Sequence, residues 1–256
     1  MNQADKRTNV TTAEVLAEVD RRRAERSTPS SDQRRKVILF LDRLVFLFAK
    51  HWAAIFNTLA LIYVGLPILA PVLLHVGLET PGMLIYTIYK PLCHQLPQRS
   101  WFLFGEKWAY SIAELGAVLG EEFTADPWSG AFVGNETLGY KMAFCQRDVA
   151  IYGMILLAGV AYSLIDRWRK VSPLPLWAYL LIGILPMGVD GGYQLLSYAL
   201  DLLFPQWPLP PYEATPLTRA ITGSLFGLAT VWLAYPHVQA ATDEMCEKLH
   251  ERFGWE

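Results

Sequence analysis

The chain has 256 residues, of which 53% are hydrophobic and only 18% are charged. The charged fraction lies below the roughly 25% of soluble domains, and the formal net charge of −2 gives no general attraction to nucleic acid. Three cysteines are too few for a disulfide framework. These values argue against a nucleic-acid-binding protein and a disulfide-rich secreted domain, and the hydrophobic residues, which occur in blocks, indicate a membrane protein.

The N-terminal region divides into two parts. Residues 1–36 are polar and basic, and we expect them to form a cytoplasmic extension. No cleavable signal peptide precedes the first apolar block, so we expect that block to be retained. Residues 37–51 are apolar but contain Asp42 and Arg43. This pattern fits an amphipathic helix lying in the membrane interface, and equally a cytosolic extension of the next helix.

Four long apolar segments predict four transmembrane helices within a membrane domain spanning residues 52–235. The fold class expected is therefore all-α, an integral membrane helical bundle. The segments are 52–78, 145–165, 174–200 and 215–235. Residues 79–142 hold shorter apolar pieces interrupted by charges, which indicate interfacial or re-entrant helices; whether residues 80–120 enter the bilayer is left open. Residues 236–256 are expected to form a cytoplasmic amphipathic tail helix.

The distribution of Lys and Arg predicts the orientation. Lys and Arg occur in both terminal regions and in the connector after the second span, whereas residues 201–217 contain none. Cytoplasmic loops carry the excess of positive charge, so we expect both termini in the cytoplasm. The expected location is the plasma membrane, in a bacterium the inner membrane, with the lipid bilayer as the main partner.

Four charged residues fall inside the predicted spans: Arg147, Asp148, Asp190 and Arg219. In the predicted topology all four lie toward the extracytoplasmic side, and Gln194 follows Asp190 by one helical turn on the same face. Charge at membrane depth is costly and usually marks a polar site. The four charges sum to zero, so two interpretations remain: a purely structural network of ion pairs, or a polar cavity that also binds a substrate.

A possible metal site precedes and overlaps these charges. Cys145 and Asp148 are spaced three residues apart and share a helix face, while Cys93 and His94 lie in the preceding loop. Two thiolates, an imidazole and a carboxylate form a suitable set of zinc ligands. Because adjacent residues seldom chelate one ion, His94 is also a candidate for an outer-sphere or catalytic role. Alternatives are a Cys93–Cys145 disulfide and inert buried cysteines. Cys246 is expected to be a free thiol.

Glycines mark two further positions. Asp190-Gly191-Gly192 suggests either a loosened helix, as in transporters, or close helix packing. Gly223 and Gly227 form a GxxxG step, which predicts close packing of the fourth span against a neighbour. The sequence contains no Walker motif, no HExxH and no nucleophile elbow.

Four ordered blocks resemble those of the membrane family DUF2085. They read CHQ-x-P-x-RS near residue 93, C-x-R-x at 145–148, DG-x-x-Q at 190–194 and LTR-x-x-TG at 217–223, within a family-like core of residues 85–235. The second block commonly has C-x-x-C, but Asp148 replaces the second cysteine here. Asp can bind zinc but cannot form a disulfide. The resemblance implies a grouping and no activity.

Three functional hypotheses follow. The first is a membrane protein with an extracytoplasmic polar site that binds zinc through Cys93, His94, Cys145 and Asp148, with Arg147, Asp190, Gln194 and Arg219 around it. Whether such a protein is an enzyme stays open; if it is, Asp190 or His94 would serve as the base for a zinc-bound water. The second is a subunit of a small-solute or ion transporter, which with four spans requires a homo-oligomer. The third is an accessory subunit of a larger membrane complex.

Overall fold

The computed structural model describes residues 16–22, 29–120, 123, 126, 129–166, 169–204, 206 and 211–255. The chain forms two compact units, Met1–His51 with Thr242–Glu256, and Trp52–Ala241. Of the polar extension 1–36, residues 16–22 and 29–36 are described, and both stretches are helical. The site discussed below lies entirely in the second unit.

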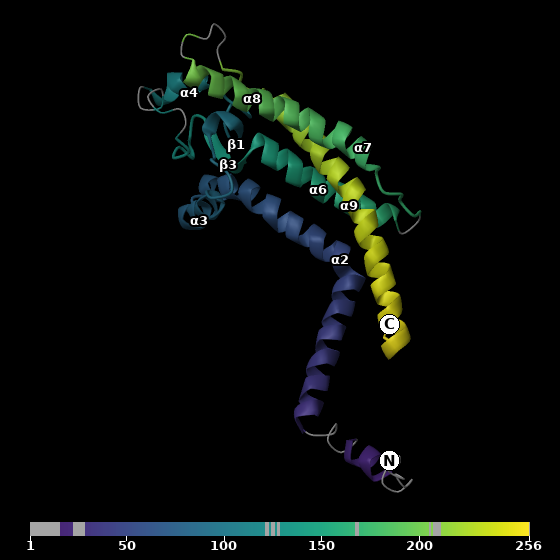
Figure 1. Ribbon diagram of the computed structural model, residues 1–256. Helices are drawn as coiled ribbons and strands as arrows, with labels where there is room; N and C mark the ends of the chain where they lie inside the picture. Colours follow the sequence, from purple (N-terminus) through teal and green to yellow (C-terminus); the bar gives the residue numbers. More distant parts are fainter. Residues whose placement is uncertain are drawn as a thin grey trace, which may run out of the picture. The chain divides into compact units, whose positions relative to one another are not determined.

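Long helices dominate the chain (Figure 1). Four helical segments are long and apolar enough to cross a membrane: Asp32–His75, Gln146–Ile165, Leu176–Leu203 and Pro216–Phe253. The predicted all-α membrane bundle is thereby confirmed. The helices are α2 (Pro29–His75), α3 (Glu79–Tyr89), α4 (Ile112–Leu119), α6 (Gln146–Ile165), α7 (Leu176–Tyr179), the π-helical turn η2 (Leu180–Ile184), α8 (Leu185–Leu203) and α9 (Pro216–Phe253), with a 3-10 turn η1 at Pro97–Arg99.

The structure shows how the helices continue at three places, two of which the sequence left open. Residues 37–51 are part of α2 rather than a separate helix, which matches the extension hypothesis. The tail residues 236–253 likewise continue α9. The third span shows no break at Gly191-Gly192, because α8 is continuous there; its departure from α-helical geometry is the earlier π-helical turn η2, which ends at Ile184. A π-bulge inserts one residue into a turn and needs no glycine.

A small antiparallel sheet, which the sequence did not predict, lies at one end of the bundle. It consists of β1 (Ser100–Leu103), β2 (Gly134–Asn135) and β3 (Gly139–Cys145) in the order β1-β3-β2. Side chains on both faces of β3 are largely buried, so the strand lacks the alternating pattern that reveals a half-exposed strand. The sheet sits against α3, which with 11 residues is about 16 Å long and too short to cross a bilayer.

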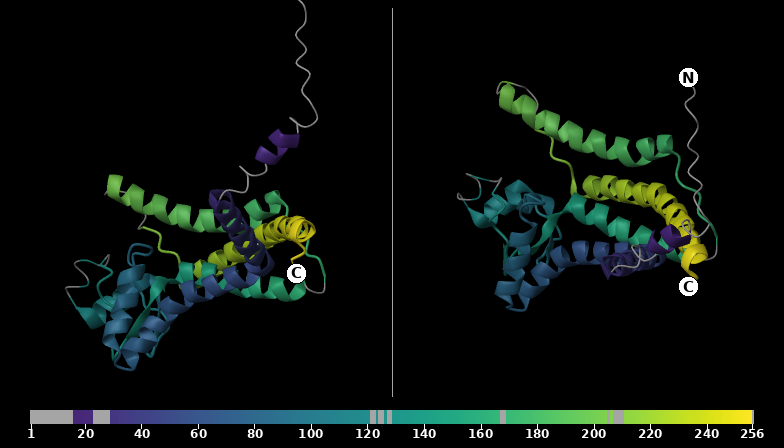
Figure 2. Two further views of the ribbon diagram at one scale, coloured as in Figure 1. Left: turned by 90° about the horizontal axis from the view of Figure 1, so that it is seen from below. Right: turned by 60° about the horizontal axis from the view of Figure 1, so that its bottom comes forward.

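The second unit is held together by close contact of α6 with α9 and with the second half of α2 (Figure 2). Trp52, Tyr162, Val231 and Tyr235 form a buried cluster between these helices. Asn57 of α2 bridges the other two helices, because it donates to the Ser163 hydroxyl at 3.2 Å and accepts from the Tyr235 hydroxyl at 3.2 Å. An amide bonded on both sides satisfies its polar atoms within the membrane layer.

The predicted GxxxG step lies at the crossing of α9 and α6. A Cβ atom added at Gly227 would lie 2.5 Å from the Ile151 carbonyl oxygen, and one at Gly223 would lie 2.9 Å from the Arg147 carbonyl oxygen. Both contacts are to backbone, which cannot rotate away as a side chain can. The glycines therefore allow the two helices to approach closely.

We expect Gly227→Ala to destabilise the bundle by about 1–3 kcal/mol, because the added methyl group forces α6 and α9 apart. The measurement is the thermal unfolding midpoint of the purified protein in detergent. The matched control is Gly188→Ala in α8, where an added Cβ meets no atom within 4 Å. Equal midpoints for Gly227→Ala and Gly188→Ala would show that the close crossing is not required.

Candidate functional site

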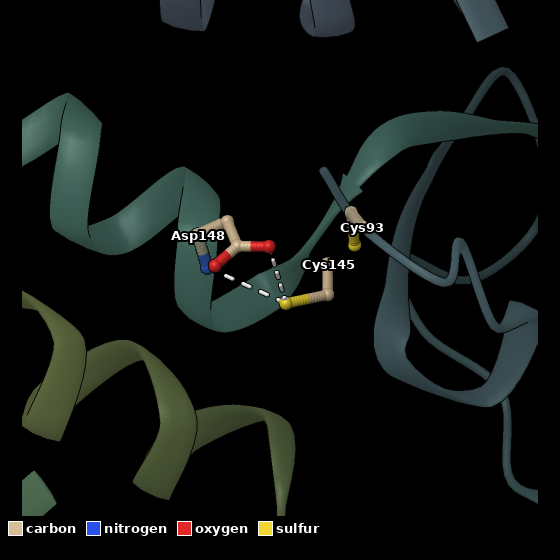
Figure 3. A group of neighbouring side chains, drawn as sticks. All are labelled: Cys93, Cys145 and Asp148. Atoms are coloured by element: carbon tan, nitrogen blue, oxygen red, sulfur yellow. Dashed lines mark hydrogen bonds between the residues drawn. The ribbon is translucent and has the colours of Figure 1, made fainter. Parts of the chain in front are cut away.

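Three side chains of types that can bind a metal ion meet where the sheet joins α6. The Sγ atoms of Cys93 and Cys145 and a carboxylate oxygen of Asp148 all lie within 4.8 Å of one another (Figure 3). Cys93 comes from the loop after α3, Cys145 ends β3, and Asp148 lies in the first turn of α6. All three cysteines of the chain are free thiols in the structure, including Cys246.

Cys145 is placed by its double role as the last residue of β3 and the N-cap of α6. Its backbone is extended, and its sulfur accepts a hydrogen bond from the Asp148 backbone N–H at 3.5 Å. The same sulfur lies 3.1 Å from the Asp148 carboxylate. Sulfur here takes the place of the side-chain oxygen that usually caps a helix. The spacing of three residues seen in the sequence therefore brings both ligating atoms together.

The acidity of the Cys93 thiol, which lies in the loop outside the spans, depends on its neighbour. A hydrogen bond with Cys145 lowers the pKa of Cys93, although burial opposes this shift. An ionised Cys93 is therefore stabilised by the Cys145 thiol beside it.

The loop that carries Cys93 is fixed by buried polar contacts. Lys141 of β3 has no solvent exposure, and its ammonium donates to the carbonyls of Gln95 and, at 2.9 Å, of Gly130. Gln95 has a positive φ of 55°, which is uncommon for a residue other than glycine, and its amide donates to the Tyr86 carbonyl at 2.9 Å. The Tyr86 hydroxyl in turn donates to the Lys141 carbonyl. These bonds hold the chain turn immediately after Cys93.

His94, predicted as a fourth ligand, does not join the three-residue cluster of the described chain. Its side chain is exposed, and it lines the same cavity as the cluster. Side chains of adjacent residues in an extended loop point in different directions. This explains why the Cys93 side chain joins the cluster and the His94 side chain does not. Both residues therefore line the cavity, Cys93 as a buried side chain and His94 as an exposed one.

The four charged residues of the predicted spans do not form two ion pairs among themselves. Arg147 forms an ion pair with Asp190 across α6 and α8. Arg219 pairs with Glu213, a residue that the sequence analysis did not single out. Asp148 faces the Cys145 thiol instead of an arginine. One of the two ion pairs therefore lies within the set of four charges, and the other recruits a carboxylate from the connector before α9.

Glu213 is the centre of the larger network. Arg99 binds both of its carboxylate oxygens, at 2.7 and 2.8 Å, and Gln194 and Tyr198 of α8 donate to it at 3.0 and 2.5 Å. Although burial alone would raise the pKa of Glu213, hydrogen bonds from Arg99 and Tyr198 hold it below its usual value. Glu213 lies just before the predicted span 215–235, and Arg99 lies in the loop 79–142. A carboxylate in a connector without Lys or Arg was the available signal for Glu213, although Asp201 shares that connector.

A cavity of about 700 Å³ connects the cluster with this network. Cys93, Cys145 and Asp148 line one side, Arg99 and Arg147 another, and α8 supplies a row of residues. Gln194 also lines it, while Asp190 and Arg219 are buried at 7% and 3% exposure behind the wall. The arrangement can therefore hold a metal ion and, beside it, a molecule with polar groups that the arginines and His94 can contact.

Two comparisons with known proteins find similarities to this chain. Residues 136–233 match the family model DUF2085, described as a predicted membrane protein, which confirms the resemblance inferred from the sequence blocks. An uncharacterised protein of the archaeon Methanocaldococcus jannaschii is 25% identical over 193 residues, covering 73% of this chain and 92% of that protein. No solved structure matches the chain.

The buried Lys141 predicts a pH dependence of stability. Burial lowers its pKa from 10.5 to about 7, so between these values the unfolded chain binds more protons than the folded one, and stability rises with pH. The rise is at most about 1.4 kcal/mol per pH unit. We expect the thermal unfolding midpoint of the wild-type protein to rise relative to that of Lys141→Met as the pH increases from 7 to 10. Lys107→Met, at an exposed lysine, is the control and should run parallel to wild type; a parallel curve for Lys141→Met would contradict the prediction.

Proposed function

We propose that this membrane protein binds a zinc ion through Cys93, Cys145 and Asp148, with the fourth coordination position open to the cavity. The observation that carries the proposal is the convergence of these three donor atoms, from two separate parts of the chain, within 4.8 Å. His94 at the cavity wall is available near the open position.

The donor set fits zinc in both size and chemistry. Tetrahedral zinc with thiolate and carboxylate ligands places neighbouring donor atoms about 3.3–3.8 Å apart. Cys145 Sγ already lies 3.1 Å from the Asp148 carboxylate, so small side-chain rotations bring the donors to these separations. Thiolates favour zinc over magnesium and calcium, which prefer all-oxygen sites.

Three protein ligands with one open position is the arrangement found in catalytic zinc sites. A zinc ion bound there supplies a Lewis acid that polarises a substrate oxygen or activates water. Arg147, held by Asp190, presents its guanidinium to the cavity and can bind a substrate oxygen. His94 can accept or donate a proton at the cavity wall. We therefore propose hydrolytic chemistry on a molecule bound in the cavity.

Metal analysis tests the zinc site directly. We expect about one zinc per chain in wild-type protein purified without chelators and less than about one tenth of that in Cys93→Ala and Cys145→Ala, because two remaining donors bind zinc weakly. The measurement is elemental analysis of the detergent-solubilised protein, supported by the visible spectrum after cobalt substitution, which reports thiolate ligation.

Cys246→Ala provides the matched control, because it removes the third thiol of the chain without touching the cluster. It should retain the full zinc content. Wild-type protein that stays metal-free after incubation with zinc, or zinc content that is equal in Cys145→Ala and wild type, would overturn the proposal.

We also propose that both termini lie in the cytoplasm and that the zinc site opens near the extracytoplasmic surface of the plasma membrane. The asymmetric distribution of Lys and Arg supports this orientation. Four spans return the chain to its starting side, and the residues of the site lie at the ends of spans that the charge pattern assigns to the outside.

The orientation is tested by reaction with a membrane-impermeant maleimide. In intact cells or right-side-out vesicles, we expect Cys246 to stay unlabelled until the membrane is opened, because the tail is cytoplasmic. A cysteine introduced by Glu106→Cys in the exposed loop after β1, in a Cys246→Ala background, should be labelled at once. The reverse pattern of labelling would refute the proposed orientation.

A further inference from the structure

We infer that the cavity takes a membrane amphiphile, whose uncharged or zwitterionic head group reaches the cysteine cluster while its apolar chain leaves sideways along α8. This inference names the substrate class of the same site, and its chemical consequence rests on the proposed zinc function. The juxtaposition that carries it is a polar base next to a rim of exposed leucines within one cavity.

The residues that α8 contributes form one helical stripe with two edges. They are spaced at the three- and four-residue intervals of a single helix face: Gly191, Gln194, Leu195, Tyr198, Asp201 and Leu202. On the inner edge, Gln194 and Tyr198 bond to Glu213. On the outer edge, Leu195 and Leu202 are 72% and 81% exposed. Exposed leucines on a membrane-spanning helix face lipid, so this side of the cavity opens toward the bilayer rather than toward water.

The depth of the cavity matches the boundary between head groups and acyl chains. Leu202 lies one residue before the end of α8, and Leu195 lies seven residues deeper, about 10 Å along the helix axis. One leaflet of the hydrocarbon core is about 15 Å thick. On the opposite wall, Cys145 and Asp148 lie within the first turn of α6, at the end of its span. A lipid entering sideways would therefore place its head group near the cluster and its upper acyl chain along the leucines.

The charges at the cavity decide between head-group classes. Of the charged residues that line it, Arg99 and Arg147 are already paired with Glu213 and Asp190, and Asp148 and Asp201 add negative charge. Such a lining gives no net attraction for a strongly anionic head group, and it offers both donors and acceptors to a neutral or zwitterionic one. The Nε atom of Arg147 is buried and has no hydrogen-bond partner among the described residues. A buried donor left unpaired is costly, and a small shift of this side chain toward a ligand oxygen would satisfy it.

A soluble polar substrate fits this cavity poorly. A site for a water-borne solute is usually ringed by polar residues, whereas Leu92, on the loop side, is also 56% exposed. An apolar rim in water would cost free energy in proportion to its area. When an acyl chain covers the same leucines, this free-energy cost is removed.

The test uses phosphatidylcholine carrying a photoreactive diazirine in either the head group or the middle of one acyl chain. Wild-type protein is reconstituted into vesicles with each probe, irradiated and mapped by peptide mass spectrometry, and the zinc content of the same samples is measured. We expect the head-group probe to label the peptides that contain Cys93 and Asp148, and the chain probe to label α8 around Leu195 and Leu202.

Leu195→Trp narrows the opening and should reduce head-group labelling at the cluster by about fivefold or more, because a preformed pocket buries most of its ligand. The matched control is Leu196→Trp, at a neighbouring lipid-facing position of 55% exposure that does not line the cavity; it should label as wild type does. Leu92→Trp, on the opposite rim, should repeat the loss and serves if Leu195→Trp does not fold.

Two results would overturn the inference. The first is zinc-containing protein whose cluster peptides are not labelled by the head-group probe. The second is equal labelling of the cluster peptides in Leu195→Trp, Leu92→Trp and Leu196→Trp, which is what ordinary surrounding lipid would give. Zinc-free protein with strong and Leu195-dependent labelling would instead defeat the proposed zinc function while supporting the lipid site. The two proposals can therefore fail separately.

Discussion

Compensation of buried charge at one end of the bundle is the constraint on which the site depends. An uncompensated charge in a low-dielectric environment costs several kcal/mol, so each arginine that the spans carry must meet a carboxylate. Glu213 meets Arg219 in α9 and also Arg99, which lies outside the spans in the turn before β1, and it is bonded by α8 as well. It thereby joins the end of the third span, the start of the fourth and the loop that leads into the sheet. The cavity exists because these three elements are held apart by polar side chains instead of collapsing on apolar ones.

The sheet serves this arrangement by directing the chain into α6. Ser100 of β1 pairs with Cys145 at the end of β3, and the helix begins at the next residue. No loop intervenes, so the position of Cys145 is set by strand pairing on one side and by helix geometry on the other. Lys141, buried in the same strand, holds the Gln95 carbonyl and hence the loop of Cys93. Both cysteines are thus positioned by β3, which gives the cluster a rigid frame at the edge of a membrane bundle.

The sequence predicted the membrane class, the four spans and the convergence of the unusual polar residues, because hydropathy and charge act over long segments and dominate at membrane depth. The packing role of Gly223 and Gly227 was also visible, since a small-residue step has one main use between membrane helices.

The sheet was missed because β3 is buried on both faces and so lacks the alternation of polar and apolar residues that marks a half-exposed strand. Glu213 and Arg99 were missed because they lie outside the spans, where charge is ordinary; only the three-dimensional approach of connector and loop reveals them as partners. The apparent break at Gly191 has a different meaning: a Cβ atom there would lie 3.0 Å from the Arg147 guanidinium, so glycine makes room for the ion pair.

Helical periodicity explains how one short motif supplies two separate systems. Arg147 and Asp148 are neighbours in the sequence, yet consecutive residues of an α-helix point about 100° apart. Arg147 therefore reaches α8 and pairs with Asp190, whereas Asp148 lies over Cys145 on the adjacent face. Had the two charges paired with each other, the carboxylate would be lost to the cysteines and Asp190 would be left alone in the membrane. Because they diverge, the proposed metal ion would bind at the cluster without breaking the ion pairs that hold the bundle end together. Asp148 would serve as a ligand there, and unlike a cysteine it cannot oxidise.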